Sequence, residues 1–553
     1  MAANGAEIIQ RYNRLKQNRA NFDARWEEMA PYIAPSRVGI TSQPSPGEKQ
    51  TRNVYDSSTM MAAEMMAMFI AGHIINPAQQ WFEFKLRDPV VGKMDSVKEW
   101  LEECRDRSLM RLSTSMFYAE GPESLIDYGG FGTGFLLTEE IPQPSNMVIT
   151  GFRGFYFHAE KIGRFVIEEG ANGLVDTAMR EFELTARVAS ERWTEEKMPD
   201  SIKNCLKGEE KLKEKPFKFI HAIIPRTISE QTAGAAGMPW ASVWVEKESK
   251  TVVHEGGYRV FPASVPRHHR TPGEVYGRGR GDLAFPDSWT LNTAKRMGLE
   301  DWALKIRPPV LVRSDSVIGS LRLVPAGPTT INTHGQKITD VIAPFETGSR
   351  PEVSSLKEEE LRRTIREIFY VDTIRQLLET SKSEMTAFEF AKKLELLFRL
   401  MGPVYGRLEW EHLYRTVDVI FDLQLYAGGF SDPPQEVYMT DGKIDVEFQN
   451  PIAKAQRAGG AESLMMAAND LAPLGQMFPQ IWDRLDPDKT ALGILNIRGV
   501  PAQWTRNDDE MLALRKEREK QDTSKLQMEE VGSMAEAAGK VAPIVKAITQ
   551  DKK

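Results

Sequence analysis

The stretch from residue 383 to residue 430 has a helical pattern that is interrupted in its middle by Gly402-Pro403. A straight helix of about forty residues would span about 60 Å, which is twice the diameter of a small domain. Proline removes a backbone hydrogen bond and its ring clashes with the preceding turn, so we expect a kink at this pair. A long helix that bends at a fixed place suits a subunit that crosses a large assembly. Its apolar stripe comprises Ala387, Ala391, Leu394, Phe398 and Met401 before the pair, and Leu413, Val417, Ile420 and Phe421 after it.

Length and charge restrict the class of protein. The chain has 553 residues, and a single core stops growing at about 250–300 residues, so several domains or one elongated subunit are expected. The 71 Lys and Arg against 78 Asp and Glu give a net charge of −7, which argues against nucleic-acid binding through bulk positive charge. Two cysteines, Cys104 and Cys205, cannot build a disulfide framework and fit assembly in a reducing cytosol.

No membrane segment is predicted. The N-terminus is charged and polar from the start, which excludes a secretory signal. The most apolar run, residues 60–77, contains Glu64 and His73 and is shorter than the about 20 apolar residues that a membrane span needs. This run is therefore predicted to be a buried helix.

The first half of the chain is predicted to be α+β. Residues 8–33 have a helical stripe, and a second helical pattern covers residues 95–118, with the strand-like "WFEFKL" before it. From residue 135 to about 265, short β-rich runs alternate with turns, which favours a mostly antiparallel sheet. These runs are "FLLTEE", "NMVITGF", "RFVIEE", "FKFIHAIIP", "ASVWVEK" and "TVVHEGGYRVFPA".

The second half is predicted to be mainly helical. A helix is expected from Pro286 to residue 307, where Pro308-Pro309 ends it because proline donates no backbone hydrogen bond. Short strands and turns follow, and a further helix is expected to open at Ser354. Short helices are predicted after residue 451, and the tail is either an exposed helix or partly disordered. The expected stripe of the first helix is Leu291, Ala294, Gly298, Trp302 and Ile306.

The sharpest enzymatic candidate is the glycine-rich "DYGGFGTGFLL" at residues 127–137. A phosphate-binding loop follows a strand and opens a helix, whereas here a helical pattern precedes and a strand pattern follows. We therefore favour a helix-to-strand turn in which glycines permit close backbone approach, with a nucleotide-binding enzyme that uses Gly129–Gly134 as the alternative.

Other chemical motifs are weak. "YGRGRGDLAFP" is expected to be a turn before a helix, and the adjacent histidines of "RHHR" point apart, which makes them a poor metal pair. No GxxxxGK[ST], HExxH or GxSxG string occurs, so ATP hydrolysis is not expected. We predict no enzyme activity, no catalytic or metal-binding residue, and no cofactor.

Several stretches, taken in order, resemble the head-to-tail connector, or portal, proteins of short-tailed bacteriophages. The family usually reads Thr-Ala-x-Glu-Val in its long helix, and Phe390 replaces the valine here. The resemblance extends over nearly the full length and is weakest at about residues 140–265 and in the last thirty residues. It is carried by "RWEEMAPYIAPSR", "VYDSSTMMAAEMMAMFIAGHIINPAQQWFEFKL", "DYGGFGTGFLL", "MTAFEFAKKLELLFRLMGPVYGRLEWEHL", "NPIAKAQRA" and "NIRGVPAQW".

The resemblance implies an elongated, mainly helical α+β subunit that forms a ring, expected to be a dodecamer, around a channel for double-stranded DNA. The implied parts are the wing (1–275, and 386–450 with the long kinked helix), the stem helices (276–308 and 354–372), the clip (309–353), the tunnel loop (373–385), the crown (451–520) and the C-terminal tail (521–553). Twelve copies with a net charge of −7 each would carry −84, which disfavours tight phosphate contacts that would stall DNA passage.

Candidate contact residues follow from these implied parts. Arg375, Glu379 and Lys382 lie in the implied tunnel loop, and Arg313, Arg322 and Lys337 in the clip. The stem carries Arg362, Arg363 and Arg366, which would face the channel or a neighbouring subunit. For these three arginines we favour pairing with Glu358, Glu359 or Glu367 at a spacing of three or four residues. Gly402 and Pro403 mark the kink.

The implied function is a conduit at one capsid vertex of the virion, assembled in the host cytoplasm. It would nucleate capsid assembly, dock the terminase motor, join the tail and pass DNA out on ejection. Implied partners are further copies of the chain, the terminase, scaffolding and major capsid proteins, a tail adaptor and internal ejection proteins. A non-ring head-completion adaptor is a further alternative, which the length of 553 residues disfavours.

Overall fold

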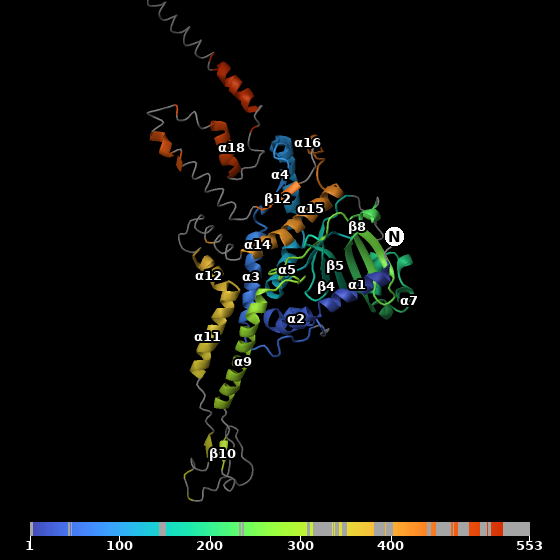
Figure 1. Cartoon of the computed structure of the whole chain (residues 1–553), viewed down its shortest axis with the longest axis vertical. Helices are drawn as coiled ribbons and strands as arrows, with labels where there is room; N and C mark the ends of the chain where they lie inside the picture. The colour runs from blue at the N-terminus through green and yellow to red at the C-terminus, as the bar shows by residue number, and fades with distance from the viewer. Residues whose placement is uncertain are drawn as a thin grey trace, which may run out of the picture. The chain divides into compact units, whose positions relative to one another are not determined.

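The computed structural model describes residues 4–41, 45, 47–142, 151–231, 234, 237–306, 310–312, 335, 337, 342–344, 351–380, 393, 402–438, 444–448, 466–467, 469–473, 480, 486–497, 506, 510–521 and 523. They form a mainly helical protein with several small sheets (Figure 1). The chain divides into two compact units, which are described separately. The first comprises 1–83, 104–431 and 446–453, and the second 84–103, 432–445 and 454–553.

The N-terminal segment forms two helices, α1 (Gly5–Asn18) and α2 (Ala20–Ile33), although the sequence predicts one. The break lies at Arg19, whose side chain is almost completely buried. Its guanidinium donates hydrogen bonds to the carbonyls of Phe165 and Gly163, and pairs with Asp23 at 2.7 Å. The helical periodicity continues across the break, so the pattern alone could not reveal it.

A five-stranded antiparallel sheet, of order β4-β5-β6-β7-β8, forms the β-rich part of the first unit. Its alternating residues face opposite sides, and both sides are covered. Tyr12 and Ile8 of α1 pack on Ile220 and Val243, while Trp193 packs on Phe219 of the other face. The strands are Phe165–Glu169, Val175–Thr185, Pro216–Pro225, Trp240–Glu246 and Val252–Tyr258. Helices α6 (Ala186–Arg192) and α7 (Asp200–Lys207) cover the face with Phe219, and the short helix α8 (Glu210–Lys213) follows α7.

A second, three-stranded sheet has the order β3-β2-β9 and is also antiparallel, as the sequence predicts. Its strands are Phe155–Ala159 (β3), Leu136–Glu140 (β2) and Ala263–Ser264 (β9). The sequence does not predict β3 or the long strand β5, because β5 carries four charged residues that weaken its apolar alternation. The predicted run "NMVITGF" lies mostly outside the described residues.

Helices form the other part of the first unit. They are α3 (Ser58–Ile74), α5 (Phe117–Phe131), α9 (Arg280–Ile306), α11 (Pro351–Ile368) and α12 (Val371–Thr380), and α9 runs beside α11 (Figure 1). The predicted buried helix is α3, which starts at Ser58. Helix α9 begins six residues before Pro286, and α11 begins at Pro351, so Ser354 lies inside a helix and not at its start.

A continuous kinked helix through Gly402-Pro403 was the wrong expectation. Gly402 has φ +46° and ψ −125°, outside the helical region, and α14 (Pro403–Leu408) starts at the proline. Proline fits the first position of a helix, where its missing N–H has no partner to lose. The helix continues as a π-helical turn, η6 (Glu409–Tyr414), and as α15 (Arg415–Tyr426). Of the preceding segment 381–401, only residue 393 is described.

The remaining elements include four short strands and the 19-residue helix α4. Strands β10 (Val310–Val312) and β11 (Ile342–Pro344) pair antiparallel between α9 and α11 in the chain. Strands β1 (Phe82–Leu86) and β12 (Ile444–Phe448) and helix α4 (Asp95–Ser113) each have residues in both units. The second unit contains α16 (Gln435–Tyr438) and α18 (Pro487–Ile497), and residues 510–521 are helical.

Among the helices that the structure describes, none combines the length and the apolar character that a membrane-spanning helix requires.

Candidate functional site

Helices α9 and α11 are joined to each other and to the start of α3 by polar contacts that are buried or partly buried. Lys295 of α9 pairs with Glu358 of α11 at 3.4 Å, and the Thr59 and Ser288 hydroxyls lie 2.7 Å apart. Arg362 of α11 pairs with Asp56 at 2.9 Å and with Glu358 at 3.2 Å. These contacts fix the two helices against the body of the first unit.

The charges at this contact shift one another's pKa values. Burial opposes the charge on Arg362, but hydrogen bonds and attraction from Asp56 and Glu358 outweigh it and raise the Arg362 pKa. Burial likewise raises the pKa of Asp56, but hydrogen bonds from Ser58 and Arg362 outweigh burial, and the net pKa is lowered. Arg362 is therefore committed to an ion pair within its own chain.

The other two arginines predicted on α11 also have partners within the chain. Arg363 lies 3.8 Å from Glu367, and both side chains are about two-thirds exposed. Arg366 pairs with Glu359 at 3.0 Å and with Asp372 at 3.3 Å. Pairing at a spacing of three or four residues, which the sequence favours, is thus confirmed for Arg362 and Arg363. The contacts of Arg366 span six and seven residues, which the helical spacing does not predict.

The remaining predicted contact residues are placed only in part. Arg375 is exposed on α12, and Lys337 is exposed in the segment between α9 and α11. Lys382, Arg313 and Arg322 lie outside the described residues, as does the side chain of Glu379.

Helix α9 exposes large apolar side chains, which the sequence does not predict. Trp302 is 64% exposed and Ile306 59%, although both belong to the predicted stripe, whose Leu291 is buried. A second set lies within about 120° around the helix, at 3.6 residues per turn, and its centre lies about 140° from Leu291. This set, called the α9 stripe below, consists of Leu283, Trp289, Met297 and Leu304, which are 41–61% exposed.

The two glycine-rich motifs, residues 127–137 and 277–281, pack against each other, and this close backbone contact is the reason both need glycine. Gly132 ends α5 with φ +91°, and a Cβ there would lie 2.5 Å from the carbonyl oxygen of Gly277. A Cβ on Gly279 would lie 2.5 Å from the carbonyl oxygen of Gly130. Backbone atoms of 277–279 therefore occupy the space beside the loop, and β2 follows it, so it offers no cradle for a phosphate. The helix-to-strand turn predicted from the sequence is confirmed.

Arg267, the first residue of "RHHR", is a buried hub between distant segments. Its side chain is 1% exposed, and it pairs with Glu411 at 2.6 Å and with Glu169. The guanidinium also donates to the carbonyl of Gly173 at 2.9 Å, while the Arg267 backbone N–H donates to Glu411 at 2.9 Å. These bonds join the β4–β5 turn, the 265–278 segment and the π-helical turn.

The π-helical turn η6 directs successive side chains inward. Glu411, His412 and Leu413 are all buried, and the His412 Nδ1 lies 2.9 Å from the Ser264 hydroxyl. Burial lowers the pKa of His412 to about 4, so its ring is neutral at pH 7. Burial also lowers the pKa of His268 to about 3.

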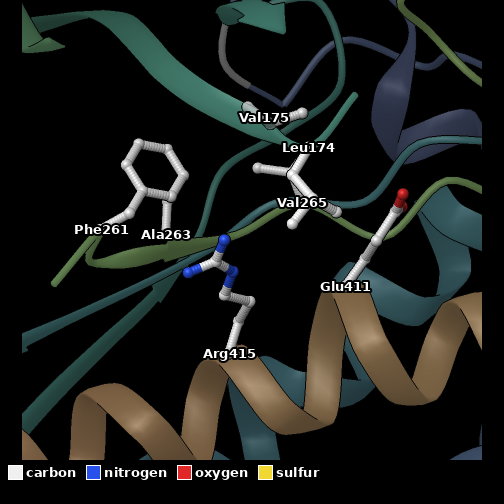
Figure 2. Close-up of a pocket in the computed structure, with 7 residues that line it drawn as sticks. All are labelled: Leu174, Val175, Phe261, Ala263, Val265, Glu411 and Arg415. Atoms are coloured by element: carbon white, nitrogen blue, oxygen red, sulfur yellow. The ribbon is translucent and has the colours of Figure 1, made fainter. Parts of the chain in front are cut away.

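A small cavity lies beside this hub. Figure 2 shows Glu411 and Arg415 projecting from one helical segment toward the strands above it. The other residues that line the cavity are apolar: Leu174, Val175, Phe261, Ala263 and Val265. The cavity is therefore a packing gap beside the ion pairs and not a cluster of catalytic groups.

Within the described part of the chain, no group of three or more His, Cys, Asp or Glu side chains is arranged to hold a metal ion. Of the adjacent histidines, His268 is buried against the Tyr128 ring, whereas His269 is exposed.

Comparison with known proteins identifies the family. A family model described as "Bacteriophage head to tail connecting protein" matches residues 5–505. The probable portal protein of Bordetella phage BPP-1 is 25% identical over 546 residues, covering 97% of this chain and 95% of that protein. The portal protein of Salmonella phage epsilon15 is 23% identical over 526 residues, covering 93% and 91%.

A solved structure titled "Virion of native gene transfer agent (GTA) particle" covers 83% of this chain and 98% of that chain at 12% identity, with a TM-score of 0.29. That score is too low to support an argument about the fold. The family match and the two phage relatives extend over nearly the whole chain. The chain therefore belongs to the bacteriophage head-to-tail connecting proteins.

Proposed function

We propose that copies of this chain close into a ring that conducts double-stranded DNA at one vertex of the capsid. The observation that carries the proposal is the α9 stripe, an exposed apolar face on a helix whose other side is already packed. Exposed apolar patches mark interaction sites in soluble proteins, and tryptophan is enriched at the centres of such sites. Because portal proteins are oligomeric, the partner is a second copy of the chain.

In the proposed ring, the α9 stripe meets a different surface of the next copy. Such head-to-tail contacts give a closed ring when the rotation between neighbouring copies closes, and an open filament when it does not. We propose a ring of twelve copies. Within each copy, α9 and α11 form the stem, residues 309–353 the clip, 373–385 the tunnel loop, 1–275 and 386–450 the wing, 451–520 the crown and 521–553 the tail.

The charge of the chain supports a channel that binds DNA only weakly. The net charge is −7, and Arg362, Arg363 and Arg366 are already paired within the chain. DNA affinity rises steeply with the number of phosphate contacts, so few free cations permit movement. Among the predicted contacts on α12 and beyond it, Arg375 and Lys382 would make transient contacts.

The position at the vertex gives the proposed partners. The ring would nucleate capsid assembly with scaffolding and major capsid proteins, dock the terminase at the clip, and later hold the tail adaptor there. Internal ejection proteins would meet the crown. The subunit has no enzymatic step in this scheme, since packaging is driven by the terminase.

Native mass measurement and negative-stain imaging of the purified chain test the ring. Wild-type protein should show one closed oligomer with a central hole, and Trp289→Glu with Met297→Glu should give monomers, because four exposed apolar positions lose two members to charge. Leu212→Glu, which places the same charge at an exposed leucine of α8, should leave the ring intact. A monomeric wild type under assembly conditions would rule out the proposal.

The channel contact is tested in packaging reactions with assembled rings. Arg375→Glu combined with Lys382→Glu should shorten the packaged DNA or reduce its retention, while ring mass remains unchanged. Charge reversal at the exposed ion pair, Arg363→Glu with Glu367→Arg, preserves net charge and serves as the control. Unchanged packaging by the first variant would show that these two residues do not contact DNA.

A further inference from the structure

The turn between α11 and α12 contains a residue in an unusual backbone conformation. Tyr370 has φ +60°, in the left-handed region that non-glycine residues rarely adopt. For a bulky aromatic residue such a conformation is strained, and it persists only where surrounding contacts hold it. The helices on either side are separated by only two residues, since α11 ends at Ile368 and α12 begins at Val371.

One contact that holds the turn comes from α9. Arg280, the first residue of α9, donates a hydrogen bond to the Tyr370 hydroxyl. Its guanidinium also lies 4.5 Å from the centre of the Tyr370 ring, in cation–π geometry. Both the hydroxyl and the ring of Tyr370 are thus engaged by a single side chain.

One further contact depends on the turned arrangement. Arg366 reaches across the turn to Asp372 at 3.3 Å. In a continuous helix, residues six apart point about 120° away from each other around the axis, so this pair could not form. On the other side of the turn, Phe369, Val371 and Ile374 are almost completely buried.

The backbone on both sides is already helical. Phe369 N–H donates to the Ile365 carbonyl at 3.2 Å, and Ile374 N–H donates to the Tyr370 carbonyl at 2.9 Å. Both bonds have the four-residue spacing of an α-helix. A change at Tyr370 from the left-handed to the right-handed region would therefore suffice to join α11 and α12.

We propose that Tyr370 is a two-position joint. In the first position, which the structure shows, Arg280 holds Tyr370 in the left-handed region and α12 leaves α11 at an angle (Figure 1). In the second, the Arg280–Tyr370 and Arg366–Asp372 contacts are broken and residues 351–380 form one helix. The joint would redirect the segment that follows α12; that this segment meets DNA rests on the proposed function.

The distance between spin labels on α11 and α12 tests the joint in the full-length protein. Labels are placed at Glu360 and Arg375, which are exposed, with Cys205 replaced by serine and buried Cys104 retained. Labelled chains are diluted with unlabelled ones, so that each assembly carries one pair. In a continuous helix the two Cα atoms would be about 22 Å apart, at about 1.5 Å per residue, and the turned state is shorter.

Tyr370→Ala and Tyr370→Gly form a matched pair. Both remove the ring and the hydroxyl, but alanine favours the right-handed region, whereas glycine adopts positive φ at no steric cost. Tyr370→Ala should shift most of the distance distribution to about 22 Å, and Tyr370→Gly should retain more of the shorter distance. If Tyr370→Ala keeps the wild-type distribution, the buried apolar residues alone fix the turn and the joint is wrong.

A second pair of variants covers the case in which Tyr370→Ala does not fold. Tyr370→Phe removes only the hydroxyl, and Arg280→Gln removes the charge over the ring. Each variant should increase the population of molecules at the longer distance. If neither variant shows this increase, the proposal is wrong. Ring mass is measured on the same samples and on the labelled wild type, whose failure to form rings would contradict the proposed function, whereas the distances report on the joint separately.

Discussion

Two regions of the first unit differ in how completely their side chains and backbone groups find partners within the same chain. At the junction of 127–137 with 265–281, glycine backbones are in direct contact and Arg267 is surrounded by acceptors from its own chain. The α9–α11 pair also has its buried polar groups paired, but α9 leaves tryptophan, methionine and leucine side chains in solvent. In the first region Arg267 finds its partners within a single copy, while the second exposes apolar side chains that we propose a neighbouring copy covers.

We therefore expect the junction to stabilise the folded subunit and the outer faces of α9 and α11 to contribute little to its stability. Substitutions at the junction should lower the free energy of unfolding, because buried groups lose partners that nothing replaces. Substitutions on the outer faces of α9 and α11 should hardly change it, because solvent substitutes for the lost contacts. The following four predictions test that contrast, in order of decreasing effect.

The largest effect is expected from Arg267→Met. The substitution leaves Glu411 buried without its cation, and breaking a buried ion pair costs about 3–5 kcal/mol. Urea unfolding of the purified chain measures the loss. Arg267→Met with Glu411→Gln should recover about 1–3 kcal/mol of it, since the uncompensated charge is gone. Strictly additive losses in the double variant would show that the two residues are not coupled.

Gly132→Ala should destabilise the junction by about 2–5 kcal/mol, from backbone strain and a clash with the facing backbone. The Cβ would lie 2.5 Å from the Gly277 carbonyl oxygen, and φ is +91°. Gly72→Ala is the control, because a Cβ at this helical position meets nothing within 4 Å. It should be neutral or stabilising by up to about 1 kcal/mol. Equal effects of the two variants, measured by urea unfolding, would contradict close glycine packing.

Acidification should weaken the same region through His412. Its pKa of about 4 in the folded chain lies below the ordinary value of about 6.5, so below pH 6.5 the unfolded chain binds the extra proton. Stability should fall by about 1.4 kcal/mol per pH unit between about pH 6.5 and 4 from this residue, and stay constant above that range. Urea unfolding at pH 7, 6 and 5 measures the slope.

His412→Gln should reduce that slope, since glutamine preserves a polar contact to Ser264 without titrating. His269→Gln, the same substitution at an exposed ring, is the control. The same slope in His412→Gln as in wild type would place the acid sensitivity elsewhere.

The smallest effect is expected on the outer face of α11. Arg363 and Glu367 are each 64% exposed, and exposed ion pairs contribute about 0–1 kcal/mol. Arg363→Ala should therefore change the free energy of unfolding by less than about 0.5 kcal/mol. Thermal unfolding at low and high salt checks this, and a loss comparable with that of Arg267→Met would end the contrast between the two regions.

Sequence patterns predicted the elements whose periodicity is strong. The buried helix α3, the helices α9 and α11 and most strands of the five-stranded sheet follow from apolar spacing. Patterns failed where a tertiary contact overrides them. The helix breaks at Arg19, whose guanidinium donates hydrogen bonds to the carbonyls of residues 163 and 165, far away in the sequence.

The site residues show the same limit. Spacing of three or four residues correctly paired Arg362 and Arg363 with glutamates of their own helix. Spacing could not reveal Asp56 as a partner of Arg362, or Glu411 as a partner of Arg267, because these partners are hundreds and more than one hundred positions away. In the sequence, Arg267 precedes His268 and Glu411 precedes His412, and this is the feature that the two partners share.

The sequence by itself determined the class of the protein, through ordered motifs spread over the chain, and the helix-to-strand turn at 127–137, through its glycines. Only the tertiary structure decided which arginines are already neutralised, which face of α9 stays uncovered, and that Gly402-Pro403 starts a helix. The physical reason is that periodicity records which side of an element is apolar, whereas burial and charge pairing depend on which distant element covers that side.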